Sequence, residues 1–330
     1  MIVKILKSNR PVVIFYFIII SILLWLFTFI NYQDIEIGFN NSQMPFYKLV
    51  VYFVNRQSLL ILIFSLILII IQGFLLIQLN KKYIIINKRT YFPAIIFIII
   101  VSSNIMYQQL NPMIFANLFL ILIINNIYSI YKADYILSKL YVTGFYVAIA
   151  SLFYFPYIFL FLLIWISLLI FKTFSGREWF VPILGLLTPY LFLFVYLFLI
   201  DDVDYLINAL EMNFKFEFAF KSISIPYAIF YSYLGLLVFI SGMSILGKLK
   251  NKKIRIRKYF KVNWWFFIIG ILMFVFLVNV SYEIIYLLAI PSSFLITEYF
   301  YQIKSKIFAN ILFLLMIGGI LFIQISNFAN

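Results

Sequence analysis

The chain contains no cysteine and no histidine among its 330 residues, and these absences exclude several classes of chemistry. Without cysteine there is no disulfide bond, thiol nucleophile or thiolate metal site, and without histidine there is no imidazole base and no histidine-ligated iron or zinc. Acidic residues are also few, because 11 Asp and Glu stand against 25 Lys and Arg, for a net charge of +14. Acid–base chemistry or ion binding in this chain therefore has to use carboxylates, lysine, arginine or tyrosine.

Long apolar runs make up most of the chain. Hydrophobic residues are 66% of the sequence and the mean hydropathy is +1.10, whereas soluble domains are roughly 45–50% apolar. No polar stretch is longer than about 25 residues, which leaves no room for a sizeable soluble domain. The sequence therefore predicts an all-α, multi-pass integral membrane protein.

The apolar runs divide into about eleven candidate membrane helices, since a span needs about 20 apolar residues. The first run, Val12–Ile30, is long enough to span and no small-residue cleavage site follows it, so we expect a retained helix rather than a signal peptide. The predicted helices are 11–31, 57–79, one from about 93, one ending near 131, two short ones within 140–172 that turn at Phe155-Pro156, 179–200, one from about 226, and three that finish the chain.

The basic residues predict the orientation of these helices. With the N-terminus in the cytoplasm, 21 of the 25 Lys and Arg fall in inner segments, as the positive-inside rule requires. Eight of the eleven acids then fall outside. The most basic segment, 248–261, carries eight Lys and Arg in 14 residues. We expect it to anchor on anionic cytoplasmic lipid or to dock a protein partner, and not to bind nucleic acid.

Two carboxylates, Asp34 and Glu36, come directly after the first apolar run. They open an outer loop, 32–56, in which the segment 46–55 is too short to span and suits an interfacial helix. Such carboxylates are either a solvated helix end or a functional pair. In the functional interpretation they act as a general base over a lipid substrate, or bind a divalent metal through oxygen.

A second outer loop, 201–225, also opens with carboxylates. Asp201, Asp202 and Asp204 form a charge cluster there, which is either solvated or able to bind a divalent ion. A lipid phosphate at the outer surface would need cations, and Lys48 and Arg56 are the candidates in the first loop. The alternative for Arg56 is that it extends to the interface without a ligand.

Buried amides are expected between the third and fourth helices, where they would form interhelical hydrogen bonds. No ionisable residue falls at the middle of a predicted span, which argues against an ion-coupled carrier. The amides are Asn104, Gln108, Asn117, Asn125 and Asn126.

The order of these features resembles a known superfamily. A cytoplasmic N-terminus, a first helix, an acidic outer loop and an interfacial helix at 46–55 are followed by the runs Asn111–Leu118 and Leu140–Ala150. Over residues 1–200 this order is similar to that of the GT-C membrane glycosyltransferases, which use polyprenyl-phosphate-linked sugars. The resemblance implies a single transmembrane domain, 1–330, in which residues 201–330 add further helices to a GT-C-like module.

The resemblance also implies roles for the outer residues. Asp34 would be the catalytic base or a metal ligand, Glu36 its support, and Arg56 with Lys48 the contacts to the lipid phosphate. No cofactor is implied, and a divalent metal is allowed but not required. The expected partners are membrane lipid, a polyprenyl-phosphate-linked sugar, and an envelope glycan or protein acceptor on the outer face of a bacterial inner (plasma) membrane.

Two other functions remain open at this stage. The large outer domains of the superfamily are missing and the outer loops are short, which suits a non-catalytic subunit that scaffolds a secretion or cell-envelope machine. A lipid flippase is the third interpretation. The first two differ in whether an outer-facing cavity is lined by Asp34.

Overall fold

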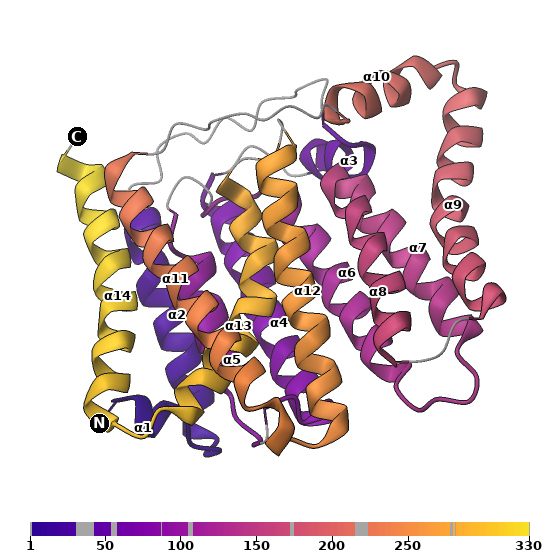
Figure 1. The fold of residues 1–330 in the computed structure, drawn as a ribbon. Helices are drawn as coiled ribbons and strands as arrows, with labels where there is room; N and C mark the ends of the chain where they lie inside the picture. The colour runs from indigo at the N-terminus through magenta and orange to yellow at the C-terminus, as the bar shows by residue number, and fades with distance from the viewer. Residues whose placement is uncertain are drawn as a thin grey trace.

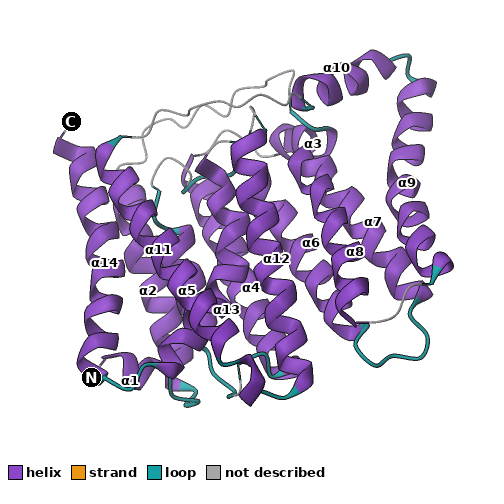
Figure 2. Ribbon diagram, viewed as in Figure 1, coloured by secondary structure: helices purple, strands orange, loops and turns teal. Residues whose placement is uncertain are grey.

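The structure is a computed structural model, and its described residues form a bundle of helices (Figures 1 and 2). No strand occurs in the part of the chain that the structure describes. That part comprises residues 2–30, 43–53, 58–86, 88–104, 108–171, 175–214, 224–277, 280 and 282–329.

Eight helices of the described chain are long and apolar enough to cross a membrane. This confirms the multi-pass helical architecture, whereas the total of about eleven spans stays a prediction. The eight are α2 (Val12–Ile30), α4 (Ser58–Tyr83), α6 (Pro112–Ser129), α9 (Gly176–Leu199), α11 (Ile225–Gly247), α12 (Ile254–Phe276), α13 (Ile285–Gln302) and α14 (Lys306–Ala329).

The remaining helices are shorter. Three of these segments are apolar and run alongside the spans: α5 (Phe92–Val101), α7 (Leu137–Phe153), and the 3-10 helix η2 (Phe155–Leu160) that continues into α8 (Phe161–Phe171). The chain turns at Tyr154, where the backbone is extended before Pro156, as the sequence predicts. The others are α1 (Ile2–Leu6), α3 (Pro45–Phe53), α10 (Val203–Asn213), η3 (Leu249–Asn251) and η4 (Tyr282–Ile284).

Two predicted loops contain helix. The second outer loop was expected to lack regular structure over 201–225, but α10 occupies Val203–Asn213. The basic loop was expected over 248–261, but α12 begins at Ile254, so half of its cations lie on helical turns. In both segments polar residues lie on a helix at the end of the bundle, where charged side chains reach water without interrupting the helix.

The loops collect at two opposite ends of the bundle, and Figure 1 shows the N-terminus at one and the C-terminus at the other. We call one the basic end: residues 2–10, 81–91, 130–139, 248–254 and 303–306. Lys7 Nζ donates to Phe300 O there, and Lys139 Nζ donates to Ser129 O. We call the other the acidic end: residues 43–53, 201–214 and 282–284.

Helix α13 is the centre of the bundle. It is the most buried span, and it packs against α5, α6, α11 and α12. Helix α9 is the least buried span and lies at the edge of the molecule in Figure 1. A central helix packed on all sides fixes the segments that flank it, which include η4 at the acidic end.

Helix α9 is held mainly by a close approach to α7, and two glycines permit it (Figure 1). A Cβ added to Gly144 would collide with the carbonyl oxygen of Pro182, and one added to Gly185 would collide with that of Tyr141. At each glycine the backbone of the other helix therefore occupies the space that a side chain would fill. Small residues of this kind let membrane helices pack closely.

We predict that Gly144→Ala destabilises the protein by about 1–3 kcal/mol, because the obstructing atoms are backbone and cannot rotate away. The thermal unfolding midpoint in detergent measures this. Gly318→Ala is the matched control, since a Cβ at Gly318 meets nothing within 4 Å. The control should be neutral or slightly stabilising, and equal midpoints for the two variants would refute the close-packing interpretation.

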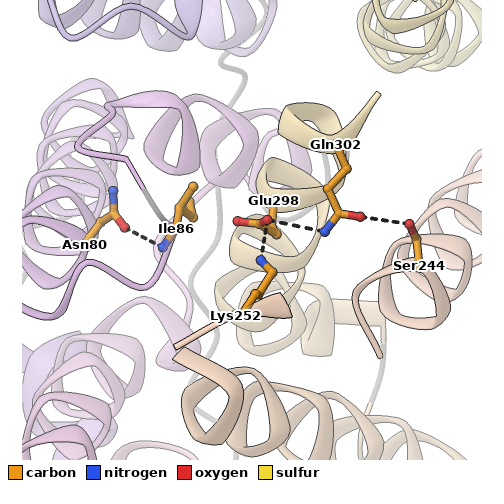
Figure 3. A network of polar contacts seen from close by, with 6 residues as sticks. All are labelled: Asn80, Ile86, Ser244, Lys252, Glu298 and Gln302. Carbon is orange, nitrogen blue, oxygen red and sulfur yellow. Dashed lines mark hydrogen bonds and ion pairs between the residues drawn. The ribbon is translucent and has the colours of Figure 1, made fainter. Parts of the chain in front are cut away.

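A buried ion pair joins three elements at the basic end (Figure 3). Lys252, just before α12, pairs with Glu298 of α13, and their side chains are 12% and 7% exposed. Gln302 Nε2 donates to Glu298 Oε1 at 3.3 Å, and Ser244 Oγ of α11 donates to Gln302 Oε1 at 3.0 Å. The network thus ties α11, α13 and the start of α12 together.

The turn after α4 is held by a single buried amide, also drawn in Figure 3. Asn80 Oδ1 accepts from the Ile86 amide at 3.1 Å, and its Nδ2 donates to Lys88 O at 3.2 Å. These bonds hold Ile84 at φ 49°, in the left-handed region that a β-branched residue rarely adopts. The hydrogen bonds of the Asn80 side chain therefore offset the backbone strain at Ile84 and hold the basic turn after α4 in place beside α13.

Removing one partner of the ion pair should be costly. We predict that Lys252→Met destabilises the protein by about 3–5 kcal/mol, because it leaves the buried Glu298 carboxylate without its partner. The double variant Lys252→Met/Glu298→Leu should recover most of that loss. Unfolding midpoints of the single and double variants measure the coupling, and strictly additive losses would show that the pair does not act as a unit.

Candidate functional site at the acidic end

Helices α3 and α10 lie together across the acidic end of the bundle (Figure 1). The Tyr205 hydroxyl of α10 donates to Gln43 O at 2.5 Å, beside the start of α3. The exposed Lys48 places its Nζ 3.8 Å from the centroid of the Tyr205 ring. Burial, and then the charge of Asp202, raises the pKa of Tyr205 to about 12. The structure thus brings Lys48 and Asp202, from the two predicted outer loops, around one tyrosine.

A small apolar cluster explains why these two helices meet. Met44, Leu152, Phe155 and Ala209 pack together beneath them and come from the start of α3, from α7, from η2 and from α10. The Phe46 ring packs edge-on against Phe153 with centroids 5.5 Å apart. A helix, α3, occupies Pro45–Phe53, where the sequence predicts one over 46–55, and its position at the membrane interface stays a prediction.

The acidic cluster of the second outer loop lies at the start of α10. Asp202 is the N-cap residue and Asp204 lies in the first turn, where the helix dipole favours negative charge. Asp201 has φ 55°, in the left-handed region that aspartate tolerates. All three side chains are exposed. Within the described ranges no group of three or more acidic residues is arranged to hold a metal ion.

The central residues of the sequence-based site lie outside the described residues. Asp34 and Glu36 fall in 31–42, and Arg56 falls in 54–57. Their proposed roles as base, support and phosphate contact stay predictions. The described ends nearest to them are Ile30 of α2 and Phe53 of α3.

Another carboxylate at the acidic end, Glu283, acts electrostatically on three tyrosines. It lies on η4, directly before α13, and it interacts electrostatically with Tyr47, Tyr157 and Tyr286. These tyrosines come from α3, η2 and α13, and all three are buried. Burial, and then the charge of Glu283, raises the pKa of Tyr47, so its hydroxyl keeps its proton at any physiological pH.

Buried amides complete this cluster. Asn117 of α6 accepts from the Tyr157 hydroxyl at 2.6 Å and donates to Tyr286 O at 2.9 Å. Asn111 caps α6 by accepting from the Ile114 amide at 3.1 Å, and its side chain also bonds Tyr286. The predicted interhelical role of Asn117 is therefore confirmed, and it serves to fix the tyrosine positions.

Between α5 and α6, the described residues 102–104 and 108–111 are irregular, and most of them are buried although several are polar. Helix α5 has only 10 residues, about 15 Å at 1.5 Å per residue, against about 30 Å for the hydrocarbon core. Ser102 accepts from Trp25 Nε1 at 3.0 Å, and Gln108 Nε2 donates to Ser102 O at 2.7 Å. Irregular backbone at membrane depth persists only where protein satisfies it or where it lines a cavity.

Comparisons with protein-family models, with curated proteins and with solved structures find no match to this chain. The functional interpretation therefore depends on the arrangement of its own residues.

The Glu283 cluster, which we define as Glu283, Tyr47, Tyr157, Tyr286, Asn111 and Asn117, offers one carboxylate and several neutral hydrogen-bonding groups. A carboxylate can accept a proton from a hydroxyl or an amide, and tyrosine hydroxyls and amides can bind the hydroxyls of a polar ligand. Tyr47 and Tyr157 already donate their hydroxyl protons to Leu110 O and Asn117 Oδ1, so these two hydroxyls can accept hydrogen bonds from a ligand but cannot donate to it.

Sequence analysis placed Glu283 among the outer acids but did not assign it to the site. Its short loop carries no motif, and the tyrosines around it come from positions 47, 157 and 286. One feature of the sequence could have identified Glu283, because it is a single acid between two apolar runs. An acid in that position is costly unless it has a partner or a function.

We predict that Glu283→Gln abolishes complementation of a deletion strain while membrane abundance stays normal. The change keeps the shape of the side chain but removes its charge, and each hydrogen bond that a ligand hydroxyl makes to the charged carboxylate is worth about 1.5–3 kcal/mol. Glu211→Gln, at an exposed position of α10, is the matched control and should complement fully. Full complementation by Glu283→Gln at normal abundance would remove this residue from the site.

Proposed function

We propose that this protein is a GT-C-like glycosyltransferase, which moves a sugar from a polyprenyl-phosphate donor to an envelope glycan or protein acceptor on the outer face of the membrane. The observation that carries the proposal is the Glu283 cluster, in which one carboxylate acts electrostatically on three buried tyrosines that other hydrogen bonds hold in place. It lies at the end of the bundle away from the basic loops, next to interfacial helix α3.

The reaction needs a proton acceptor and a leaving phosphate. A carboxylate takes the proton from the acceptor hydroxyl or amide, the acceptor atom bonds to the anomeric carbon, and the bond from that carbon to the phosphate oxygen breaks. The electron pair leaves with the polyprenyl phosphate. We assign the base to Asp34 with Glu36 in support, and the phosphate contacts to Arg56 and Lys48.

Glu283 and its tyrosines would bind the sugar or acceptor hydroxyls in this scheme. Asn117 supports that assignment, because its two hydrogen bonds hold Tyr157 and the α13 backbone in one position. A polar ligand that meets fixed donors and acceptors loses little further entropy on binding. The predominance of amides and hydroxyls over charges favours a neutral, hydroxyl-rich ligand such as a sugar.

The proposed orientation follows from the charges. The basic end faces the cytoplasm of a bacterial inner membrane, as the distribution of Lys and Arg predicts. The shorter segments α5, α7 and α8 then complete eleven passes with the eight long spans. Residues 1–200 form the GT-C-like module, and α11 to α14 are additions to it. A cytosolic protein partner, if present, would meet the basic segment 248–261.

The experiment is to measure lipid-linked sugars in a deletion strain by mass spectrometry. We predict that polyprenyl-phosphate sugars accumulate, that wild-type protein restores their level, and that Asp34→Asn does not. The change keeps the side-chain shape and removes its basicity, for an expected loss of about 10²–10⁴-fold in turnover. Asp204→Asn, at an exposed acid of the second outer loop, is the control and should restore the level.

Unchanged lipid-linked sugars in the deletion strain, together with full rescue of its phenotype by Asp34→Asn, would contradict the proposal. That result would support the non-catalytic alternative, a subunit that scaffolds a secretion or envelope machine. Membrane abundance of each variant is checked by immunoblot, so that a folding defect is not read as lost catalysis.

A further inference from the structure

The first helix of the chain is bound to the basic end of α13 and α14. Helix α1 contacts α14, and the Val3 amide donates to Asn310 Oδ1 at 3.2 Å. Directly after α1, Lys7 O accepts from the Tyr301 hydroxyl at 2.6 Å, and Lys7 Nζ donates to Phe300 O. Both the backbone and the ammonium group of Lys7 are therefore held beside the last turn of α13.

Two lysines from different segments share the ring of Tyr301. Lys7 Nζ lies 5.2 Å from the centroid of this ring, and Lys88 Nζ, from the turn after α4, lies 5.4 Å from it. The ring attracts each ammonium group, whereas the two positive charges repel one another. An anion between the two lysines would replace that repulsion with two attractions.

No acid of the described chain pairs with either lysine. Glu298 acts electrostatically on Tyr301, but it is already paired within the network of Figure 3. An ammonium group carries three N–H donors, and in the described chain only Phe300 O accepts a hydrogen bond from Lys7. Lys7 therefore has donors left for a ligand, and Lys88 is exposed to solvent.

Lys7 loses its proton at a lower pH than an ordinary lysine. Burial, and then the charge of Lys88, lowers the pKa of Lys7 from 10.5 to about 8. About half of the Lys7 side chains are therefore neutral at pH 8, where an ordinary lysine is almost fully charged. An opposite charge beside an ammonium group favours its charged form, so a bound anion would raise this pKa.

The position of the two lysines limits which anion they can meet. Tyr301 lies in the last turn of α13, which is long and apolar enough to span a membrane, and tyrosines favour the headgroup level at the ends of spans. Lipid headgroups carry phosphate at this level, and free phosphate reaches it from water. The oxygens of one phosphate can accept from two ammonium groups at once.

We propose that Lys7 and Lys88 together bind a phosphate group at the ring of Tyr301, at the basic end of the bundle. The ligand is either a lipid headgroup or a free phosphate, since both present the same oxygens. A bound phosphate would join α1, the turn after α4 and the end of α13. The proposal is independent of the proposed transferase, because it concerns other residues.

The assay is acylation of Lys7 by an amine-reactive ester at pH 8, followed by peptide mass spectrometry, because only the neutral amine reacts. The full-length protein is held in maltoside micelles and phosphate-free buffer, to which phosphatidic acid or inorganic phosphate is added. We expect the ligand to raise the pKa of Lys7 toward 10.5, which lowers its acylation by more than about tenfold. The exposed Lys132 of the same sample is the reference for reagent loss and micelle charge.

The variant Lys88→Gln tests whether the two lysines act together. It removes one of two charge-assisted contacts, so the ligand concentration that half-protects Lys7 should rise at least about tenfold. Lys250→Gln removes the same charge from an exposed position between α11 and α12, and should leave that concentration unchanged. Without ligand, neither variant should unfold at a lower temperature than the wild type.

The two ligands distinguish the source of the phosphate. Protection by phosphatidic acid alone assigns the site to a lipid headgroup, whereas protection by inorganic phosphate as well shows that a free phosphate suffices. Protection of Lys7 by neither ligand would overturn the proposal. Equal loss of protection in Lys88→Gln and Lys250→Gln would also overturn it, because that result indicates attraction to the basic end as a whole.

Discussion

The close packing of α13 is the constraint on which the rest of the structure depends. In a bilayer, helices gain little by hiding apolar side chains from lipid tails that are equally apolar, so they associate through packing and hydrogen bonds. Helix α13 packs against other helices on all sides, because it contacts α5, α6, α11 and α12, and most of its residues are buried. Any element that touches it is thereby placed relative to the others.

The two acids that flank this helix have opposite surroundings. Glu298, near its last turn, is paired with Lys252 and accepts from Gln302, so its charge is neutralised inside the protein. Glu283, before its first turn, is half-buried, and its charge acts on Tyr47, Tyr157 and Tyr286. A carboxylate paired with lysine inside the protein serves packing, whereas we propose that the one at the acidic end meets the ligand. We therefore assign structure to the first and chemistry to the second.

The bundle is packed unequally around the proposed site. The elements around the Glu283 cluster are fixed by buried hydrogen bonds, such as that from Tyr47 to Leu110 O. The helices beside it, α11 and α12, leave an apolar groove between them.

The sequence by itself determined the features that arise within one segment. The helix α2, the short helix α3 and the turn before Pro156 all follow from local apolar runs and turn chemistry. Only the tertiary structure decided which distant side chains meet. Asn117 joins Tyr157 of η2 to Tyr286 of α13, and the charge of Glu283 acts on both and on Tyr47 of α3, because these elements come together at the acidic end. The physical reason is that periodicity fixes the face of a helix, whereas helix–helix packing chooses the face that it meets.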